Sequence, residues 1–187
     1  MKKVTVTSVL LLSLFAVACS ENAESTDENG EKKTEQSSTT KDISDNPCDL
    51  INADDMRTLL GVSGDHDISM EAKDYTFPAC SFRWEDGKVK RTMEIGGREM
   101  TIDSPSEVMV VLVKDSNESK FDRSTAVYKD GVTVEGLGDE AMWGEEMSQL
   151  SFRKGNVMMH VNVKIDNDSA VNKEGAMKIA NFLLEKL

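Results

Sequence analysis

The stretch QLSFRKGNVMMHVNVKI, residues 149–165, decides the fold expected for this chain of 187 residues. Apolar residues recur at every second position on both sides of Lys154-Gly155-Asn156. Such alternation indicates a strand with one buried face, and a short break containing glycine between two such runs is typical of a β-hairpin. The stretch therefore predicts two antiparallel strands joined by a tight turn.

The second of these strands has two faces of different character. One face is apolar and is expected in the core: Val157, Met159, Val161, Val163 and Ile165. The opposite face carries Asn156, Met158, His160, Asn162 and Lys164. Met158 and His160 together offer soft ligands of the kind that Cu(I) prefers, although no third ligand can be identified. The alternative is an ordinary half-exposed strand without a metal.

A second hairpin is predicted upstream. VKRTMEI, residues 89–95, places its apolar side chains on one side, with Arg91 as the exception. The dipeptide Gly96-Gly97 then leads into REMTI, residues 98–102, as in a glycine-containing hairpin turn.

Further segments complete the expected fold. ACSFRWE, residues 79–85, alternates like a strand, and EVMVVLVK, residues 107–114, is apolar on both faces, as a covered central strand would be. The mostly polar residues 116–129 predict a short helix or a loop.

Helices are expected near both ends of this strand-rich region. Asn52 is a good N-cap, and Gly61 lies where a left-handed C-cap belongs, so the intervening residues predict a short helix. Apolar residues at helical spacing predict a second helix from Ser169 or Ala170 to Leu187. The order helix, strands, helix predicts an α+β fold with a mainly antiparallel sheet and the C-terminal helix packed on it.

The N-terminus has the pattern of an export signal. Lys2 and Lys3 precede an apolar run, residues 9–18, which at about 15 Å of helix is too short for a comfortable membrane span. This pattern predicts a signal peptide over residues 1–18. Ala16-Val17-Ala18-Cys19 resembles the lipobox of bacterial lipoproteins, which implies cleavage before Cys19 and acylation of that residue. The alternative is a plain signal peptide with a coincidental cysteine.

This resemblance implies a location in the cell envelope. The chain would lie at the outer membrane where two membranes are present, and otherwise on the outer face of the cell membrane. Several acyl chains make such an anchor effectively stable.

Residues 20–46 are polar and acidic apart from Ala23 and Ile43. Such a composition predicts a disordered spacer, so that residues 19–46 form the lipidated cysteine and tether and residues 47–187 a single globular domain. The net charge of −12 gives no electrostatic basis for nucleic-acid binding. It also predicts repulsion from an anionic leaflet, which leaves the acylated cysteine as the expected attachment to the bilayer.

Setting Cys19 aside leaves Cys48 and Cys80. In an exported protein two such cysteines predict a disulfide, whose loop of roughly 33 residues is worth about 3–4 kcal/mol. The alternative is a catalytic or metal-binding thiol pair, for which a CxxC spacing is missing.

Several short motifs also resemble a family. They are Pro47-Cys48-Asp49-Leu50-Ile51 followed by a helix ending Leu59-Leu60-Gly61, Cys80 four residues before Trp84, residues 134–143 (VEGLGDEAMW) and the C-terminal helix. In this order they resemble a family of uncharacterised cell-envelope lipoproteins, best known from actinobacteria and described as a domain of unknown function. The resemblance implies a Cys48–Cys80 bridge and an α/β sandwich somewhat like PsbP-type folds, and it implies no activity. The abundance of Met and Lys departs from the Ala-rich composition expected of that family.

The glycines of Gly136-Leu137-Gly138-Asp139-Glu140 predict a tight turn with positive φ, because the phosphate-binding loop patterns are incomplete. Met142 and Trp143 follow this turn. They are candidates for partner binding if exposed, and core residues otherwise.

No catalytic set can be recognised in the sequence. We therefore expect a non-enzymatic binding or interaction module that engages an envelope protein or small ligand, with no cofactor. The alternatives are a copper-binding protein using Met158 and His160, and a small hydrolase.

Overall fold

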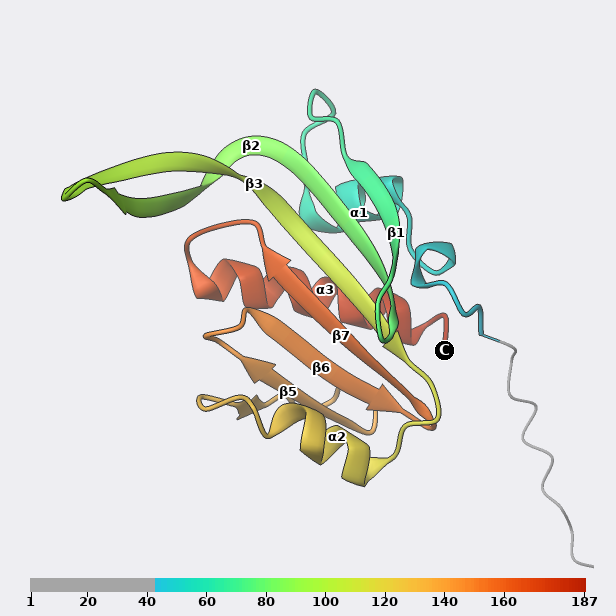
Figure 1. The fold of residues 1–187 in the computed structure, drawn as a ribbon. Helices are drawn as coiled ribbons and strands as arrows, with labels where there is room; N and C mark the ends of the chain where they lie inside the picture. The colour runs from blue at the N-terminus through green and yellow to red at the C-terminus, as the bar shows by residue number, and fades with distance from the viewer. Residues whose placement is uncertain (1–42) are drawn as a thin grey trace, which may run out of the picture. The chain divides into compact units, whose positions relative to one another are not determined.

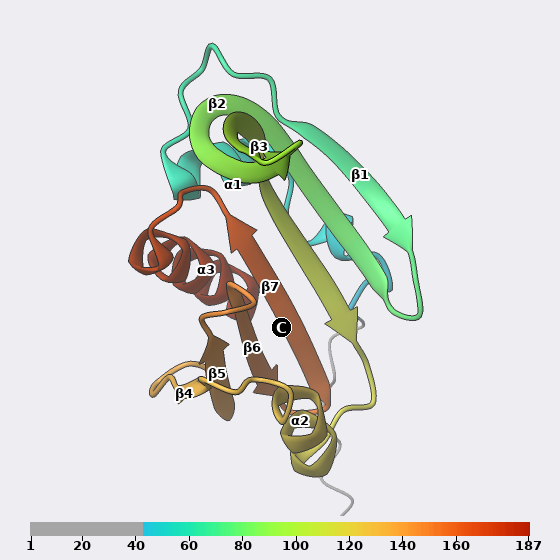
Figure 2. The same cartoon turned by 60° about the vertical axis from the view of Figure 1, so that its left-hand side comes forward.

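A seven-stranded antiparallel sheet organises the part of the chain that the computed structural model describes, residues 43–187. The predicted signal peptide, Cys19 and nearly all of the predicted spacer lie outside the described residues. The strands follow the spatial order β1-β2-β3-β7-β6-β5-β4 (Figures 1 and 2). Their bounds are β1 Ser69–Asp74, β2 Pro78–Ile95, β3 Arg98–Val113, β4 Val132–Thr133, β5 Glu140–Gly144, β6 Gln149–Lys154 and β7 Val157–Lys164.

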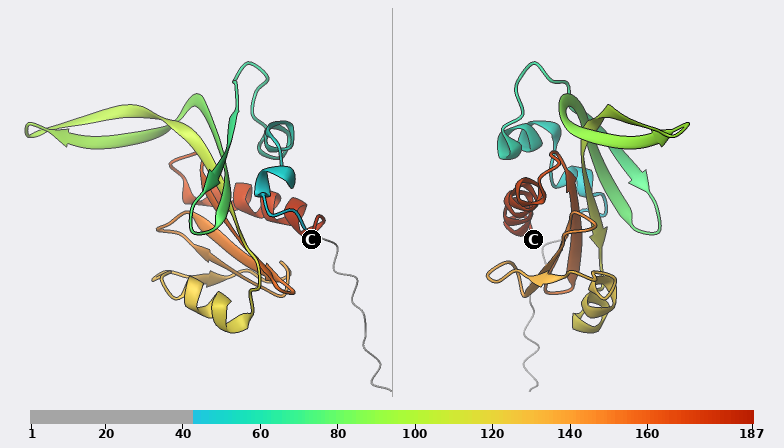
Figure 3. Two further views of the ribbon diagram at one scale, coloured as in Figure 1. Left: turned by 45° about the vertical axis from the view of Figure 1, so that its right-hand side comes forward. Right: turned by 90° about the vertical axis from the view of Figure 1, so that its left-hand side faces the viewer.

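Helices cover the two faces of this sheet unequally. They are the 3₁₀ helix η1 (Pro47–Asp49) and the α-helices α1 (Ala53–Leu60), α2 (Glu118–Thr125) and α3 (Ser169–Leu184). Helices α1 and α3 lie on one side and α2 on the other (Figure 3, right). The predicted α+β fold with its antiparallel sheet and packed C-terminal helix is confirmed.

The predicted caps of α1 are also confirmed. The Asn52 side chain accepts hydrogen bonds from the backbone N–H groups of Asp54 and Asp55, and the Asp55 carboxylate accepts one from the Asn52 N–H. Gly61 ends the helix with φ 64°, a left-handed conformation that glycine adopts without a steric penalty. At the other end of the domain, α3 stops at Leu184, three residues before the predicted end.

The β6–β7 hairpin has the predicted turn and provides much of the core. Lys154 pairs with Val157 across Gly155 and Asn156, and the register continues to Gln149 opposite Asn162. The expected core face of β7 is buried against α3, whose buried residues include Ala176, Ile179, Ala180 and Leu183. The prediction that this face of β7 lies in the core is therefore confirmed.

The second predicted hairpin is longer than expected. Strands β2 and β3 pair over their whole length, with one break in register between Trp84 and Val89. Beyond this break the two strands leave the sheet as a projecting ribbon that turns at Gly96-Gly97 (Figure 1). We call residues 89–104 the β-arm.

The predicted disulfide is present. Cys48 in η1 and Cys80 in β2 are bonded, with 5.1 Å between their Cα atoms, and Cys80 is fully buried. The bridge fixes the entry of the chain onto the apolar face of the sheet.

The folded part begins slightly before the predicted boundary at Pro47. Ile43 packs against the core, Lys114 Nζ donates a hydrogen bond to the Ile43 carbonyl at 2.6 Å, and Asn46 caps η1. The one large apolar side chain of the predicted spacer therefore belongs to the domain. Among residues 43–187, no helix combines the length and apolar character needed to cross a membrane.

Candidate functional site

The face of the sheet opposite α3, here called the outer face, is covered at one end and open at the other. Met158 is only 2% exposed and packs with Val113 and Phe121 of α2. His160 is half-buried, and Lys164 farther along β7 is exposed. The half-exposed strand expected from the sequence is thus wrong for Met158, because α2 lies over that end of β7.

Local sequence explains how α2 reaches this position. The Asn117 side chain caps its N-terminus by accepting from the Lys120 N–H, and Phe121 and Thr125 form its buried side. Phe121 is the large apolar residue that attaches the otherwise polar helix to Val113 and Met158.

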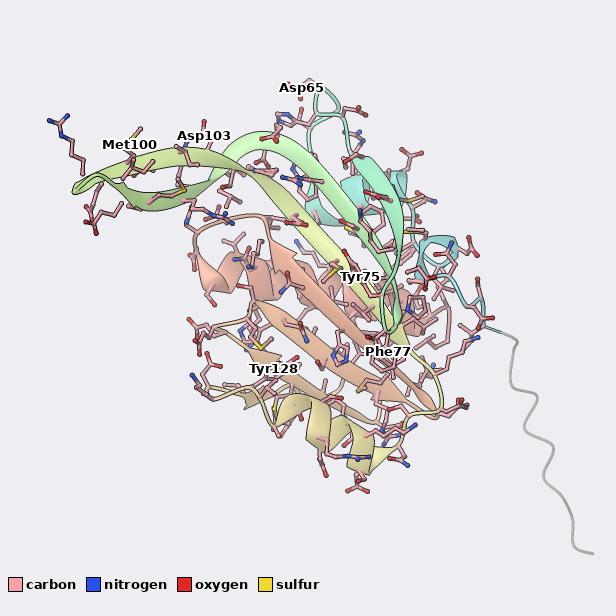
Figure 4. All side chains as sticks on the ribbon, in the orientation of Figure 1. Asp65, Tyr75, Phe77, Met100, Asp103 and Tyr128 are labelled. Carbon is pink, nitrogen blue, oxygen red and sulfur yellow. A yellow bond between two sulfur atoms is a disulfide. The ribbon has the colours of Figure 1, made fainter. Side chains whose placement is uncertain are left out.

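Next to this cluster, three hydrogen bonds link four side chains into a chain. Gln149 Nε2 lies 2.6 Å from the Tyr128 hydroxyl, which lies 2.5 Å from Ser151 Oγ. Ser151 Oγ in turn lies 2.6 Å from His160 Nδ1. Tyr128, labelled in Figure 4, follows α2 and covers the strands beneath it.

Burial sets the direction of these hydrogen bonds. It lowers the pKa of His160 to about 4, so the imidazole is neutral near pH 7, and it raises the pKa of Tyr128, which keeps its proton. Because Gln149 Nε2 can only donate, Tyr128 donates to Ser151 and Ser151 donates to His160 Nδ1. Each hydroxyl then donates once and accepts once, and the His160 proton lies on Nε2.

The Ser151–His160 pair does not form an accessible nucleophile and base. Ser151 is fully buried, so a substrate cannot reach its hydroxyl oxygen in this conformation. The other hydrogen-bond partner of Ser151 is the Tyr128 phenol, and no carboxylate within residues 43–187 is hydrogen-bonded to His160. These hydrogen bonds stabilise the outer face of the sheet. They do not support the hypothesis that the protein is a hydrolase.

A hollow of about 250 Å³ opens between α2 and the turn that joins β1 to β2. Its apolar lining is Phe77, Val113 and Met158, and its polar lining is Lys120, Arg123 and Ser124. We call it the Phe77 pocket. Figure 4 labels Phe77 at the β1–β2 turn, where its side chain is 46% exposed.

A second hollow, of about 370 Å³, also has Phe77 in its lining. Pro78 and Leu112 form its apolar part, and Asp45 and Lys114, which pair with each other, border it. The exposed Phe77 side chain is therefore shared by the linings of two hollows.

The two basic residues of the Phe77 pocket are not neutralised. Lys120 Nζ donates to the Asp115 carbonyl at 2.6 Å, and Arg123 Nε donates to the Ser119 carbonyl at 3.1 Å. Neither side chain forms an ion pair with a carboxylate of the described residues. The pocket thus combines an apolar floor with two available positive charges.

The structure places Met158, His160 and Met142 on the outer face of the sheet and Trp143 in the core. Met158 lines the Phe77 pocket, and His160 is the neighbouring residue on the same face of β7. Met142 is half-buried against the Met158 cluster. Trp143 points to the opposite face and is 2% exposed, so of the two alternatives left by the sequence it takes the core-packing role and is not an exposed partner-binding residue.

The pairing of Met158 and His160 as copper ligands stays a prediction. His160 Nδ1 already accepts from Ser151, which leaves only Nε2 for a metal. Within residues 43–187, His, Cys, Asp and Glu side chains nowhere gather in a group of three that could hold a metal ion.

Several site residues have no signal in the sequence alone. Phe77, Lys120 and Arg123 come from a turn and a polar helix that meet only in the folded chain. Ser151 opposite His160, in contrast, follows from the hairpin register once the turn at Gly155-Asn156 is accepted.

Comparisons with known proteins add no assignment. A scan against protein-family models, a search of the curated proteins and a search of the solved structures each gave no match. The resemblance of the domain to uncharacterised envelope lipoproteins and the lipobox at Cys19 therefore stay predictions.

Proposed function

We propose that this chain is a lipid-anchored, non-enzymatic binding module of the cell envelope. Its Phe77 pocket would hold a segment of another envelope protein in which acidic and apolar side chains alternate. The observation that carries this proposal is the lining of the pocket, where Lys120 and Arg123 face Phe77, Val113 and Met158.

The charge of the pocket is opposite to that of the chain as a whole. The chain has 34 acidic and 22 basic residues, yet this pocket has two cations and no carboxylate among its lining residues. An acidic side chain bound there would gain charge-assisted hydrogen bonds that the surrounding acidic surface does not offer. A basic ligand would meet two like charges, Lys120 and Arg123, among the residues that line the pocket.

The size of the two hollows favours side chains of a peptide. At about 250 and 370 Å³, they lie near the lower end of the range of about 300–1,000 Å³ that is typical of small-molecule pockets. The exposed Phe77 ring, which lines both hollows, can contact apolar side chains of a bound peptide. Aromatic residues of this kind are frequent anchors in protein–protein interfaces.

The pocket floor is held in place before binding. Met158 is fixed between Val113 and Phe121, and α2 continues into the Tyr128 hydrogen-bond chain. A preorganised site loses less conformational entropy when a partner binds. The pocket is therefore suited to recognition without catalysis.

A peptide titration tests this proposal. Fluorescent peptides alternating Glu with Leu are titrated against the full chain in detergent, and peptides alternating Lys with Leu serve as the charge control. We expect the Glu-Leu peptide to bind and the Lys-Leu peptide to bind at least about tenfold more weakly, a difference worth about 1.4 kcal/mol. The measurement is fluorescence anisotropy.

Variants locate the binding. Lys120→Gln with Arg123→Gln is expected to weaken binding of the Glu-Leu peptide at least about tenfold. Lys129→Gln with Lys173→Gln removes the same charge at positions that make no side-chain hydrogen bond or ion pair among residues 43–187, and is expected to leave binding within about twofold. Equal binding of both peptides, or equal loss in both variants, would contradict the proposal.

A further inference from the structure

The β-arm has one apolar face and one polar face. Directly opposite residues in an antiparallel pair point to the same side, so the observed register assigns each residue to a face. One face carries Val89, Arg91, Met93, Ile95, Arg98, Met100, Ile102 and Ser104. The other carries Lys90, Thr92, Glu94, Glu99, Thr101 and Asp103.

The apolar face is open to solvent. Ile95 is 53% exposed, Met100 49% and Ile102 40%, although all three are large apolar side chains. No described helix or strand packs on this part of the ribbon (Figure 1). Exposed apolar side chains that share one face usually mark a surface that is covered in function.

The charged residues divide sharply between the two faces. The apolar face has Arg91 and Arg98 and no carboxylate, whereas the polar face has Glu94, Glu99 and Asp103, the last paired with Lys90. Neither arginine makes an ion pair with a described residue. This pattern of exposed apolar side chains flanked by free guanidinium groups matches the interface of a bilayer containing anionic lipids.

We infer that the apolar face of the β-arm docks onto the surface of an anionic phospholipid bilayer. Ile95, Met100 and Ile102 would enter the boundary between headgroups and acyl chains, and Arg91 and Arg98 would bind lipid phosphates. The arm would then orient the domain on the membrane. This inference is independent of the Phe77 pocket.

The β-arm is fixed to the domain at its base. Asn167, in the loop between β7 and α3, accepts a hydrogen bond from the Lys90 N–H at 2.7 Å and donates one to the Lys90 carbonyl at 2.8 Å. Arg91 borders a hollow beside this attachment, which is also lined by Glu145 and Asp166. Docking of the arm would therefore position the whole domain.

A second copy of the chain fits this face less well. Two apolar faces brought together would place Arg98 of both copies in one interface to which the β-arm itself contributes no carboxylate. Unpaired like charges in an apolar interface are unfavourable. The same charges are attracted by anionic headgroups, which is why we commit to the bilayer.

The net charge of the chain led to the opposite expectation, namely repulsion from an anionic leaflet. That expectation treats the charge as uniformly distributed. The two faces of the β-arm show that cations and exposed apolar side chains are locally combined, while the carboxylates of the arm face away. Attraction within a Debye length depends on this local arrangement.

Radical footprinting of methionine tests the inference on the full chain. The chain is reconstituted in vesicles of phosphatidylcholine, or of phosphatidylcholine with phosphatidylglycerol, and is also kept in detergent; oxidation is read by mass spectrometry. Met100 on the arm and Met70 on β1 have similar exposure, 49% and 44%, so Met70 is the internal control. We expect Met100 oxidation to fall roughly threefold or more only with phosphatidylglycerol.

Two variants sharpen this test. Arg91→Gln with Arg98→Gln is expected to abolish the protection of Met100, whereas Lys90→Gln removes one cation from the polar face and is expected to preserve it. Equal oxidation of Met100 in all three preparations would overturn the inference. So would equal protection in both kinds of vesicle, or protection that rises with protein concentration in detergent, which would indicate pairing of two copies.

Discussion

Ser151 Oγ lies 2.6 Å from His160 Nδ1, at directly opposite positions of the β6–β7 hairpin and beneath Tyr128. The bond joins two polar residues on the outer face of strands that bury their other faces in the core. Because Ser151 is inaccessible and His160 is held neutral, the pair supports the floor next to the Phe77 pocket.

The burial of His160 predicts that the stability of the folded chain depends on pH through the titration of this residue. Burial lowers its folded-state pKa to about 4, below the ordinary 6.5, so the unfolded chain binds more protons between these values. The contribution of neutral His160 to the free energy of unfolding is fully present above pH 6.5 and is lost as the pH falls to about 4. It amounts to about 3 kcal/mol.

His160→Gln removes the titration and provides the measurement. Urea unfolding at a series of pH values from 7 to 4 gives the free energy of unfolding for both chains. We expect the difference between wild type and variant to shrink by about 3 kcal/mol as the pH falls. A difference that stays constant over this range would mean that His160 has an ordinary pKa in the folded chain.

The glycine turn before β5 supplies a matched pair of substitutions. Gly136 and Gly138 both have positive φ, 76° and 67°, as expected from the sequence. A Cβ at Gly136 meets open space, whereas one at Gly138 would lie 2.4 Å from the Arg153 carbonyl oxygen. We expect Gly136→Ala to cost about 1 kcal/mol and Gly138→Ala at least about twice that, because its neighbour is backbone.

Thermal and urea unfolding of the two glycine variants check this expectation. The Arg153 carbonyl also accepts a hydrogen bond from the Asp139 N–H at 2.7 Å, so any shift at Gly138 disturbs that bond. Equal costs at the two positions would show that the turn moves freely away from β6.

The Cys48–Cys80 bridge closes a loop with a sequence separation of 32 residues. Replacing both cysteines with alanine is expected to lower the free energy of unfolding by about 3–4 kcal/mol, since the unfolded chain regains the entropy of the open loop. Wild type treated with dithiothreitol should unfold at the same urea concentration as the double variant. A loss below about 1 kcal/mol would contradict a stabilising role.

Lipidation of Cys19 has a direct test by intact-mass and peptide mass spectrometry of the chain purified from bacterial membranes. We expect a mature N-terminus at Cys19 with a diacylglyceryl group, and a Cys19→Ala chain that lacks this mass. An unmodified Cys19, or a chain cut at another residue, would instead indicate a plain signal peptide.

The sequence predicts best those elements whose signal is local. Asn52 and Gly61 bound α1 because capping depends on neighbouring backbone groups, and the hairpin at Gly155 follows from alternation on both sides of a turn. Strand β1 is not among the predicted elements: Ile68, Met70 and Ala72 alternate with polar residues, but this alternation is short and nearly all residues of the strand are exposed at the sheet edge. Edge strands are held by backbone pairing, which side-chain patterns do not report.

The candidate site could be predicted only in part, for a related reason. The alternation along β7 correctly predicts that Met158 lies on the outer face, but its burial depends on Phe121 of a helix whose sequence is mostly polar. Lys120 and Arg123 meet Phe77 only through the packing of α2 beside the β1–β2 turn. Contacts between distant segments of this kind are not encoded in the pattern of any one segment.

The most direct test of the proposed function is to map where an acidic-apolar peptide binds. Methyl resonances of the full chain in detergent are recorded during titration with the Glu-Leu peptide. We predict the largest shifts at Met158 and Val113, which line the Phe77 pocket, and none at the exposed Val171 of α3. Largest shifts elsewhere, or no shifts at saturating peptide, would contradict a binding module built around this pocket.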